Sequence, residues 1–447
     1  MALFYRLFFV VGFLLTNLQC SRDHRNTDIP ISQQESRPVE AWVREATFAR
    51  IEIPAEADGK VFLRLQQRLD DLQGAGFTVV WLSSIFPSSS LRQQPESSDP
   101  FPTQDYLSVN EDFGTLEEFK HLVREASRRG MRIVIDLQAR YTAWDSKLVL
   151  EHPDWFRTND EGAIVSPTPE LSDVAALNYR HHELRKYMIE VLKYWVREAG
   201  VDGFACLDAD HVPLEFWIRA RKEIEEIKPV IFIGQSDRGE LHREAFDATF
   251  SSAVSNLLDH AAGASSIAQM LKSEAEQFPR NAIRLRLHRP LSTFPQKTNT
   301  PEETRIEQLR EALAYTLPGN PVIVLSDALL LDRWQAGGKV LQFHSTLSRL
   351  RTEYSAVTKG ELNVMTLTEA GDFIAYERRM PGESILVLLN NSSKRQSISI
   401  QLPPQFSGIV LDFIAGNQLP TRTGYLNLQC LPYEAKVIIR SSKGKST

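Results

Sequence analysis

Hydrophobic and polar positions alternate along the chain in a pattern that predicts a parallel sheet wrapped by helices. From Ala46 onward, short apolar runs of strand length are separated by longer amphipathic stretches. This order is typical of parallel strands joined by crossover helices. The predicted strands cover residues 48–53, 78–82, 132–136, 203–207, 230–234, 248–251, 283–287 and 321–325. Eight such strands predict an α/β fold, a closed (β/α)8 TIM barrel.

Two of the intervening helices carry clear start signals. Thr115 and Glu118 have the spacing of a capping box, in which each side chain hydrogen-bonds the other residue's backbone N–H. Thr300 and Glu303 repeat this spacing, with Pro301 at the first helical position. These residues predict helix beginnings and carry no catalytic meaning.

One connection and the C-terminal part depart from the barrel pattern. Residues 138–176 form a strand-to-helix connection far longer than usual, and its aromatic residues predict a folded loop subdomain over the barrel mouth. After about residue 358 the pattern changes to short alternating strands at 383–389, 396–402, 425–429 and 435–439. We therefore expect a barrel over 42–355, interrupted by the subdomain 138–176, and an antiparallel β-sandwich over 356–441.

The N-terminus has the order of charged and apolar residues that is typical of an export signal. Arg6 precedes an apolar run over 7–15, which is too short to span a bilayer and ends before Cys20. We expect an export signal over 1–20, a polar linker over 21–41 and a tail over 442–447. Cys20 resembles the lipidated cysteine of a bacterial lipoprotein, with a plain cleaved signal or a short membrane anchor as alternatives. The expected location is the periplasm or cell surface, at the membrane.

Composition narrows the class of partner. The formal net charge is only −6, and the Lys and Arg residues are dispersed, so there is no electrostatic footprint for nucleic acid. Cys206 and Cys430 lie far apart on predicted strands, which favours two buried thiols over a disulfide.

Several motifs resemble the α-amylase family, family 13 of the glycoside hydrolases. They lie between about Trp42 and Arg440. The motifs are His152-Pro153-Asp154-Trp155-Phe156, Asp173-Val174-Ala175-Ala176-Leu177-Asn178-Tyr179, Gly203-Phe204, Asp105-Tyr106, Asp112-Phe113-Gly114-Thr115 and Ala314-Tyr315-Thr316-Leu317-Pro318-Gly319-Asn320-Pro321. The resemblance implies a TIM barrel with its site at the carboxyl ends of the strands.

The resemblance also implies three catalytic acids, and none stands at its expected position. A retaining glycosidase attacks the sugar with one carboxylate and protonates the leaving oxygen with another. The family's arginine and aspartate nucleophile on strand 4 correspond to Ala205 and Leu207. Its strand-5 glutamate corresponds to Gln235, and the aspartate after strand 7 corresponds to Arg289, which would place a cation where a carboxylate stabilises the transition state.

Asp208 directly follows the missing nucleophile, but side chains alternate faces along a strand. A shift of one residue should turn its carboxylate away from the barrel axis, so we interpret Asp208, and Asp210 with it, as a solvent-side or helix-capping acid.

These departures lead us to expect a pseudoenzyme that binds a carbohydrate or a protein through its barrel mouth. Heavy subunits of heteromeric amino-acid transporters, which are amylase-like ectodomains with eroded catalytic sites held at a membrane, offer an analogy for a non-catalytic ectodomain more than for its partner. The alternative is an active α-glucan glycosidase or transglycosidase with relocated acids, for which Asp208, Asp237 and Glu240 are the nearest candidates.

Candidate ligand-binding residues surround the predicted mouth. They are Tyr141, Trp144, His211 and His288, although packing of the subdomain and the rim explains the same residues equally well. We expect no cofactor. Family members often bind calcium near the long loop, but the usual asparagine is replaced here by Arg140, which argues against such a site.

Overall fold

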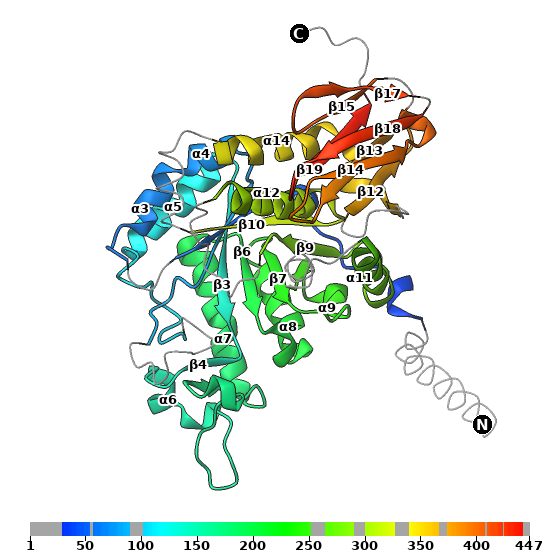
Figure 1. The fold of residues 1–447 in the computed structure, drawn as a ribbon. Coiled ribbons are helices and arrows are strands. Elements are labelled where there is room, and N and C mark those ends of the chain that lie inside the picture. The colour runs from blue at the N-terminus through cyan, green and yellow to red at the C-terminus, as the bar shows by residue number, and fades with distance from the viewer. Residues whose placement is uncertain are drawn as a thin grey trace, which may run out of the picture.

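The chain folds into a closed barrel, which is followed in the sequence by a smaller C-terminal β domain, as Figure 1 shows. In this computed structural model the described residues are 29–53, 57–89, 102–251, 264–289, 300–326, 339–365, 373–406, 409–422 and 424–440. The expected signal over 1–20 with Cys20, residues 21–28 of the expected linker and the tail over 442–447 lie outside them. Within the described ranges, none of the helices combines the length and the apolar character needed to cross a membrane.

Eight parallel strands form the barrel, which confirms the predicted fold class. They are β1 (Phe48–Glu52), β2 (Val79–Leu82), β3 (Arg132–Gln138), β6 (Gly203–Leu207), β7 (Ile231–Gln235), β8 (Ala248–Phe250), β9 (Ile283–Leu287) and β10 (Asn320–Ser326). The sheet order is β1-β10-β9-β8-β7-β6-β3-β2, and β1 closes the circle by pairing with both β2 and β10. The predicted strands agree with these bounds to within about two residues, as is usual for element ends.

Helices surround this barrel, and both predicted capping boxes form. Helices α5 (Leu116–Arg128) and α12 (Pro301–Thr316) begin after Thr115 and Thr300, whose hydroxyl oxygens accept the backbone N–H of Glu118 and Glu303. The other main helices are α3 (Val61–Gln67), α4 (Leu69–Gly74), α7 (His182–Tyr194), α8 (Leu214–Glu225), α9 (Leu241–Glu244), α11 (Ala264–Gln277) and α14 (Lys339–Glu353). Helix α7 continues into a π-helical turn, η4 (Trp195–Ala199).

The long connection after β3 is a folded subdomain that projects from the barrel beside α7 (Figure 1). It contains the antiparallel pair β4 (Tyr141–Ala143) and β5 (Val174–Ala176), helix α6 (Lys147–Glu151) and two short 3-10 turns, η2 (Pro153–Trp155) and η3 (Pro169–Leu171). The Trp155 side chain is only 7% exposed and stacks on His152 at a centroid distance of 3.9 Å. Its role in this arrangement is packing.

The C-terminal domain is built from two antiparallel sheets. The first contains β11 (Glu361–Met365), β12 (Phe373–Met380), β13 (Glu383–Asn390), β19 (Ala435–Arg440), β15 (Val410–Asp412) and β16 (Asn417–Leu419). The second contains β14 (Gln396–Gln401), β18 (Tyr425–Cys430) and β17 (Thr421–Arg422). Apolar side chains from both sheets share one buried cluster, the arrangement of a sandwich. Cys430 lies in it, and Cys206 lies in the barrel; both are free, buried thiols.

Candidate functional site

The carboxyl ends of the barrel strands form the candidate site, and side-chain alternation decides which residues face the barrel axis. Ala205 of β6 belongs to the buried cluster that fills the barrel interior, together with Ile231 and Ile233 of β7, and the partly buried Leu207 packs against this cluster. Gln235 continues the inward-facing row of β7, because it follows Ile233 by two residues. The positions to which the resemblance assigns a nucleophile and a general acid therefore face the axis as leucine and glutamine.

The floor of the mouth is a buried ionic network that the sequence analysis did not identify. The Arg50 guanidinium donates to both carboxylate oxygens of Asp136 at 2.8 Å and to Glu52 at 2.6 Å. Trp81 adds an indole N–H to Asp136 at 2.7 Å. Burial raises the pKa of Glu52 above its ordinary value, and the nearby Asp136 charge adds to this, although Arg50 acts in the opposite direction. Glu52 is thus an inward-facing carboxyl group that is more easily protonated than usual.

Asp208 lies at the rim of the mouth in a conformation that strand alternation did not predict. Its backbone is left-handed, with φ 51° and ψ 35°, which is uncommon for a residue other than glycine. Its N–H donates to Gln235 Oε1 at 3.2 Å, and its carboxylate lies 3.5 Å from both Gln138 Nε2 and the Arg140 guanidinium. The expectation of a solvent-side or capping acid was wrong, because the left-handed turn brings the carboxylate over β3, and no cap hydrogen bond forms.

His288 and Arg289 follow β9 as buried residues with local partners. Val324 N–H donates to His288 Nδ1 at 3.1 Å, which leaves Nε2 facing the Glu307 carboxylate at 3.4 Å. Arg289 forms an ion pair with the same carboxylate on α12. Burial opposes ionisation of Glu307, but the hydrogen bond and positive charges around it lower its pKa to about 2. Arg289 therefore does not place an uncompensated cation in the mouth as expected, because Glu307 neutralises it.

The remaining candidate ligand residues are distributed unevenly. Tyr141 is only 4% exposed, so its ring is enclosed by the subdomain. Trp144 is half-buried and donates its indole N–H to the Ser172 carbonyl at 3.0 Å. His211 is exposed, and its Nδ1 lies 3.9 Å from the Asp208 carboxylate. Of the four predicted residues, His211 is the one that is both open to solvent and beside the Asp208 site.

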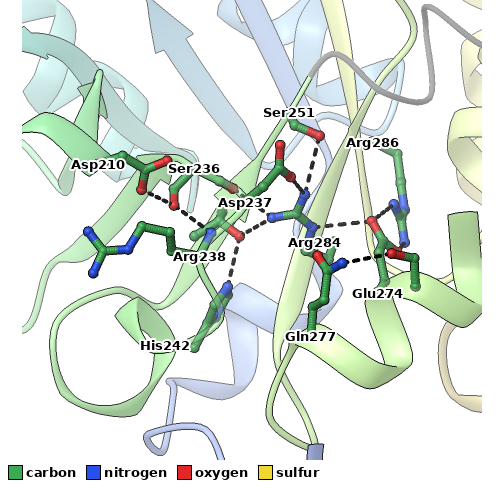
Figure 2. Close-up of polar contacts among 12 residues, drawn as sticks. Asp210, Ser236, Asp237, Arg238, His242, Ser251, Glu274, Gln277, Arg284 and Arg286 are labelled. Carbon is green, nitrogen blue, oxygen red and sulfur yellow. Dashed lines mark hydrogen bonds and ion pairs between the residues drawn. The ribbon is translucent and has the colours of Figure 1, made fainter. Parts of the chain in front are cut away.

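The other nearby acids are held by local partners, and Figure 2 shows Asp237 and Asp210 with theirs. Asp237 pairs at 2.5 Å with Arg284, which projects from β9 on the face opposite to the inward Leu285. Glu240 pairs with Arg238 at 2.7 Å. Asp210 accepts a hydrogen bond from Ser236. Among these candidates, Asp208 alone is within hydrogen-bonding reach of inward-facing residues of both neighbouring strands. No group of three potential metal-ligating side chains is found among the described residues.

Comparison with known proteins agrees with this architecture. The family model for the α-amylase catalytic domain matches residues 63–160. Neopullulanase 2 from Thermoactinomyces vulgaris is 23% identical over 420 residues, covering 83% of this chain and 69% of that protein. A cyclomaltodextrinase from Bacillus sp is 25% identical over 374 residues, covering 72% of this chain and 64% of that protein. The chain thus spans about two thirds of the length of these relatives.

Solved structures show the same fold over nearly the whole chain. A maltogenic α-amylase, AmyB, from Thermotoga neapolitana superposes with a TM-score of 0.73 at 23% identity, covering 89% of this chain and 99% of that one. An α-amylase from Lactobacillus plantarum gives 0.73 at 20% identity, covering 90% and 100%.

These findings correct the expectation of a pseudoenzyme. The relatives are named as enzymes, including neopullulanase, cyclomaltodextrinase and maltogenic amylase, which contradicts the prediction of a non-catalytic binding protein. The resemblance in the motifs, the family match and the barrel topology agree with one another. The chain resembles the α-amylase family, family 13 of the glycoside hydrolases, in its motifs, in the family-model match over residues 63–160 and in its barrel topology.

Proposed function

We propose that the protein is a glycoside hydrolase that acts on α-linked glucans with relocated carboxylates. The observation that carries this proposal is the position of Asp208, whose carboxylate lies at the barrel mouth within 3.5 Å of Gln138 and Arg140. The names of its relatives, which include neopullulanase and cyclomaltodextrinase, support the substrate class. Leu207, the residue aligned with the family nucleophile, is the direct neighbour of Asp208.

Asp208 has the surroundings of a nucleophile. Its carboxylate lies 3.5 Å from the Arg140 guanidinium, and the amides of Gln138 and Gln235 flank it as donors and acceptors for sugar hydroxyls. Left-handed backbone at a residue other than glycine costs about 1–3 kcal/mol and is concentrated at functional sites. Here that conformation is what directs the carboxylate toward the mouth.

Glu52 is the candidate for the proton donor. Its carboxyl group is buried at the inward face of β1, and burial raises its pKa, so it keeps its proton to higher pH than an ordinary glutamate. In a double displacement, Asp208 would attack the anomeric carbon while Glu52 protonates the leaving oxygen; Glu52 would then take a proton from the water that releases the sugar. Such chemistry requires the two carboxyl groups to come within about 5–5.5 Å in the complex with substrate.

Hydrolysis of a chromogenic maltoside and of a cyclodextrin by the full chain tests this proposal. Asp208→Asn should abolish turnover, since an amide cannot form the glycosyl ester. Glu52→Gln should lower kcat by about 10²–10⁴-fold and remove the alkaline limb of the pH profile, because the acid must be protonated to act. Asp237→Asn is the matched control, because that carboxylate pairs with Arg284 outside the barrel axis.

Two results would overturn the proposal. One is a folded wild-type protein that hydrolyses neither substrate. The other is turnover in which Asp208→Asn matches Asp237→Asn, which would assign the chemistry to other groups.

We also propose that the protein is exported and anchored to a membrane through Cys20. The apolar run 7–15 after Arg6 supports this proposal. Mass spectrometry of the mature N-terminal peptide tests it: a diacylglycerol mass on Cys20 is expected, and an unmodified peptide that starts at Met1 would refute it.

A further inference from the structure

A second hollow lies on the outer side of helix α7, away from the strand ends. It has a volume of about 310 Å³. Its main lining residues are Leu107, Tyr187, Glu190, Tyr194, Arg197 and Glu198. All but Leu107 recur at helical spacing along α7 and η4, so they share one face of the helix (Figure 1 labels α7). The buried residues of α7, such as Leu184 and Leu192, pack on the barrel from a different face.

The two tyrosines in the hollow are held in place by buried tryptophans. Tyr187 lies against Trp155 at a centroid distance of 5.5 Å, and Tyr194 meets Trp195 edge-on at 5.3 Å. Neither phenolic hydroxyl makes a hydrogen bond to another described residue. Both phenolic oxygens remain accessible to solvent. Both hydroxyls are therefore open to a ligand. Burial raises the pKa of Tyr187 to about 12, so its hydroxyl remains a proton donor at neutral pH.

Charged side chains border these rings on a distorted part of the helix. Arg197 and Glu198 are exposed and belong to the π-helical turn η4, an irregularity that is frequent at functional sites. Arg197 lies 4.0 Å from Glu190, and Glu198 lies 3.8 Å from Lys120, so the ion pairs are long and exchange easily with solvent. The hollow thus combines fixed aromatic faces with exposed donors and acceptors.

We propose that this hollow is a second carbohydrate-binding site that holds a segment of α-glucan outside the barrel mouth. Aromatic side chains offer an apolar face for the C–H surface of a sugar and a polar atom at the edge, while carboxylates and guanidinium groups bind hydroxyls. Lys193 pairs with Glu190 at 2.8 Å and Lys120 lies 3.8 Å from Glu198, so the charges around the hollow are balanced, which suits a neutral ligand. The sugar class rests on the proposed function, but binding here needs no turnover. The site would keep a long substrate attached to the outer surface of the barrel.

Binding to insoluble starch and to maltoheptaose tests this inference on the full chain. Tyr194→Ala and the double variant Glu190→Gln/Glu198→Gln should each weaken starch binding by about tenfold, the loss of about 1.4 kcal/mol. Turnover of the small chromogenic maltoside should stay at the wild-type level, because that substrate is too short to need a second site. Tyr425→Ala is the matched control, since Tyr425 is a 43% exposed tyrosine on the C-terminal domain.

The outcomes separate this inference from the proposed function. Starch binding that is equal in wild type, in both α7 variants and in Tyr425→Ala would overturn the second site, whatever the activity. Binding that is lost in the α7 variants but kept in Asp208→Asn would support it, even if the wild type hydrolyses nothing. The charge variant keeps the test valid if Tyr194→Ala unfolds, because Glu190 and Glu198 are exposed.

Discussion

A buried histidine beside the barrel should make the protein sensitive to moderate acid. His242 in α9 is fully buried, and its Nε2 lies 2.8 Å from the Thr249 hydroxyl. Its Nδ1 is buried without a hydrogen-bond partner among the described residues. Arg284 lies close by, and Figure 2 shows both side chains in the same cluster. Burial, and then the positive charge of Arg284, lower the pKa of His242 to about 3.

The sign and size of the effect follow from proton linkage. The unfolded chain binds a proton at this histidine below about pH 6.5, whereas the folded chain resists it until about pH 3. Burying the neutral His242 therefore costs no stability above about pH 6.5. The free energy of unfolding falls as the pH drops from there toward 3, because only the unfolded chain binds the proton. From these two pKa values, the loss between pH 7 and pH 5 is about 2 kcal/mol in the free energy of unfolding. That is a substantial part of a typical stability of about 5–15 kcal/mol.

Urea denaturation at pH 7 and pH 5 measures this loss. His242→Gln should remove about 2 kcal/mol of the pH dependence, because glutamine can still hydrogen-bond Thr249 but does not titrate in this range. His121→Gln is the matched control, since His121 is exposed and its Nδ1 lies 2.9 Å from Gln66 Oε1. If His242→Gln loses as much stability as the wild type between the two pH values, the reasoning from burial is wrong.

Three further changes test the packing that supports the site. Asp136→Leu should lower the free energy of unfolding by about 3 kcal/mol in urea, because it leaves the buried Arg50 with a single carboxylate partner; an unchanged midpoint would contradict this. Gly319→Ala should lower the Tm, because φ is +116° and an added Cβ would lie 2.1 Å from the Arg284 carbonyl oxygen; an equal Tm would show that the backbone can shift. Arg378→Met should cost about 2 kcal/mol and speed proteolysis of the C-terminal domain, because the buried carbonyl of Thr316 and the part-buried carbonyl of Gly360 lose their donor; wild-type proteolysis would refute that role.

The sequence predicted the barrel well because its signals are local. The Thr115 and Thr300 capping boxes form as expected, since each depends on residues three positions apart. The eight strands were found because a strand buried on both faces appears as a short apolar run. The two-sheet C-terminal domain followed from the change to alternating patterns.

The floor of the site was missed because its partners are distant in the chain. Arg50 and Glu52 are two charged residues in a five-residue strand, a pattern that equally fits a strand with one exposed face. Only closure of the barrel brings Arg50 to Asp136, 86 residues further on. Arg289 was misjudged for the same reason, because the charge that neutralises it, Glu307, lies on the following helix.

Asp208 shows where strand alternation stops being a valid guide. The rule that neighbours face opposite sides holds only while the backbone is extended, and β6 ends at Leu207. One residue later the backbone turns to φ 51°, and the carboxylate lies beside Gln138 of the adjacent strand instead of on the outer face. An acid lost from the last strand position can therefore be replaced by its neighbour, provided that the turn is left-handed. Leucine at position 207 consequently does not decide whether this strand supplies a carboxylate to the mouth.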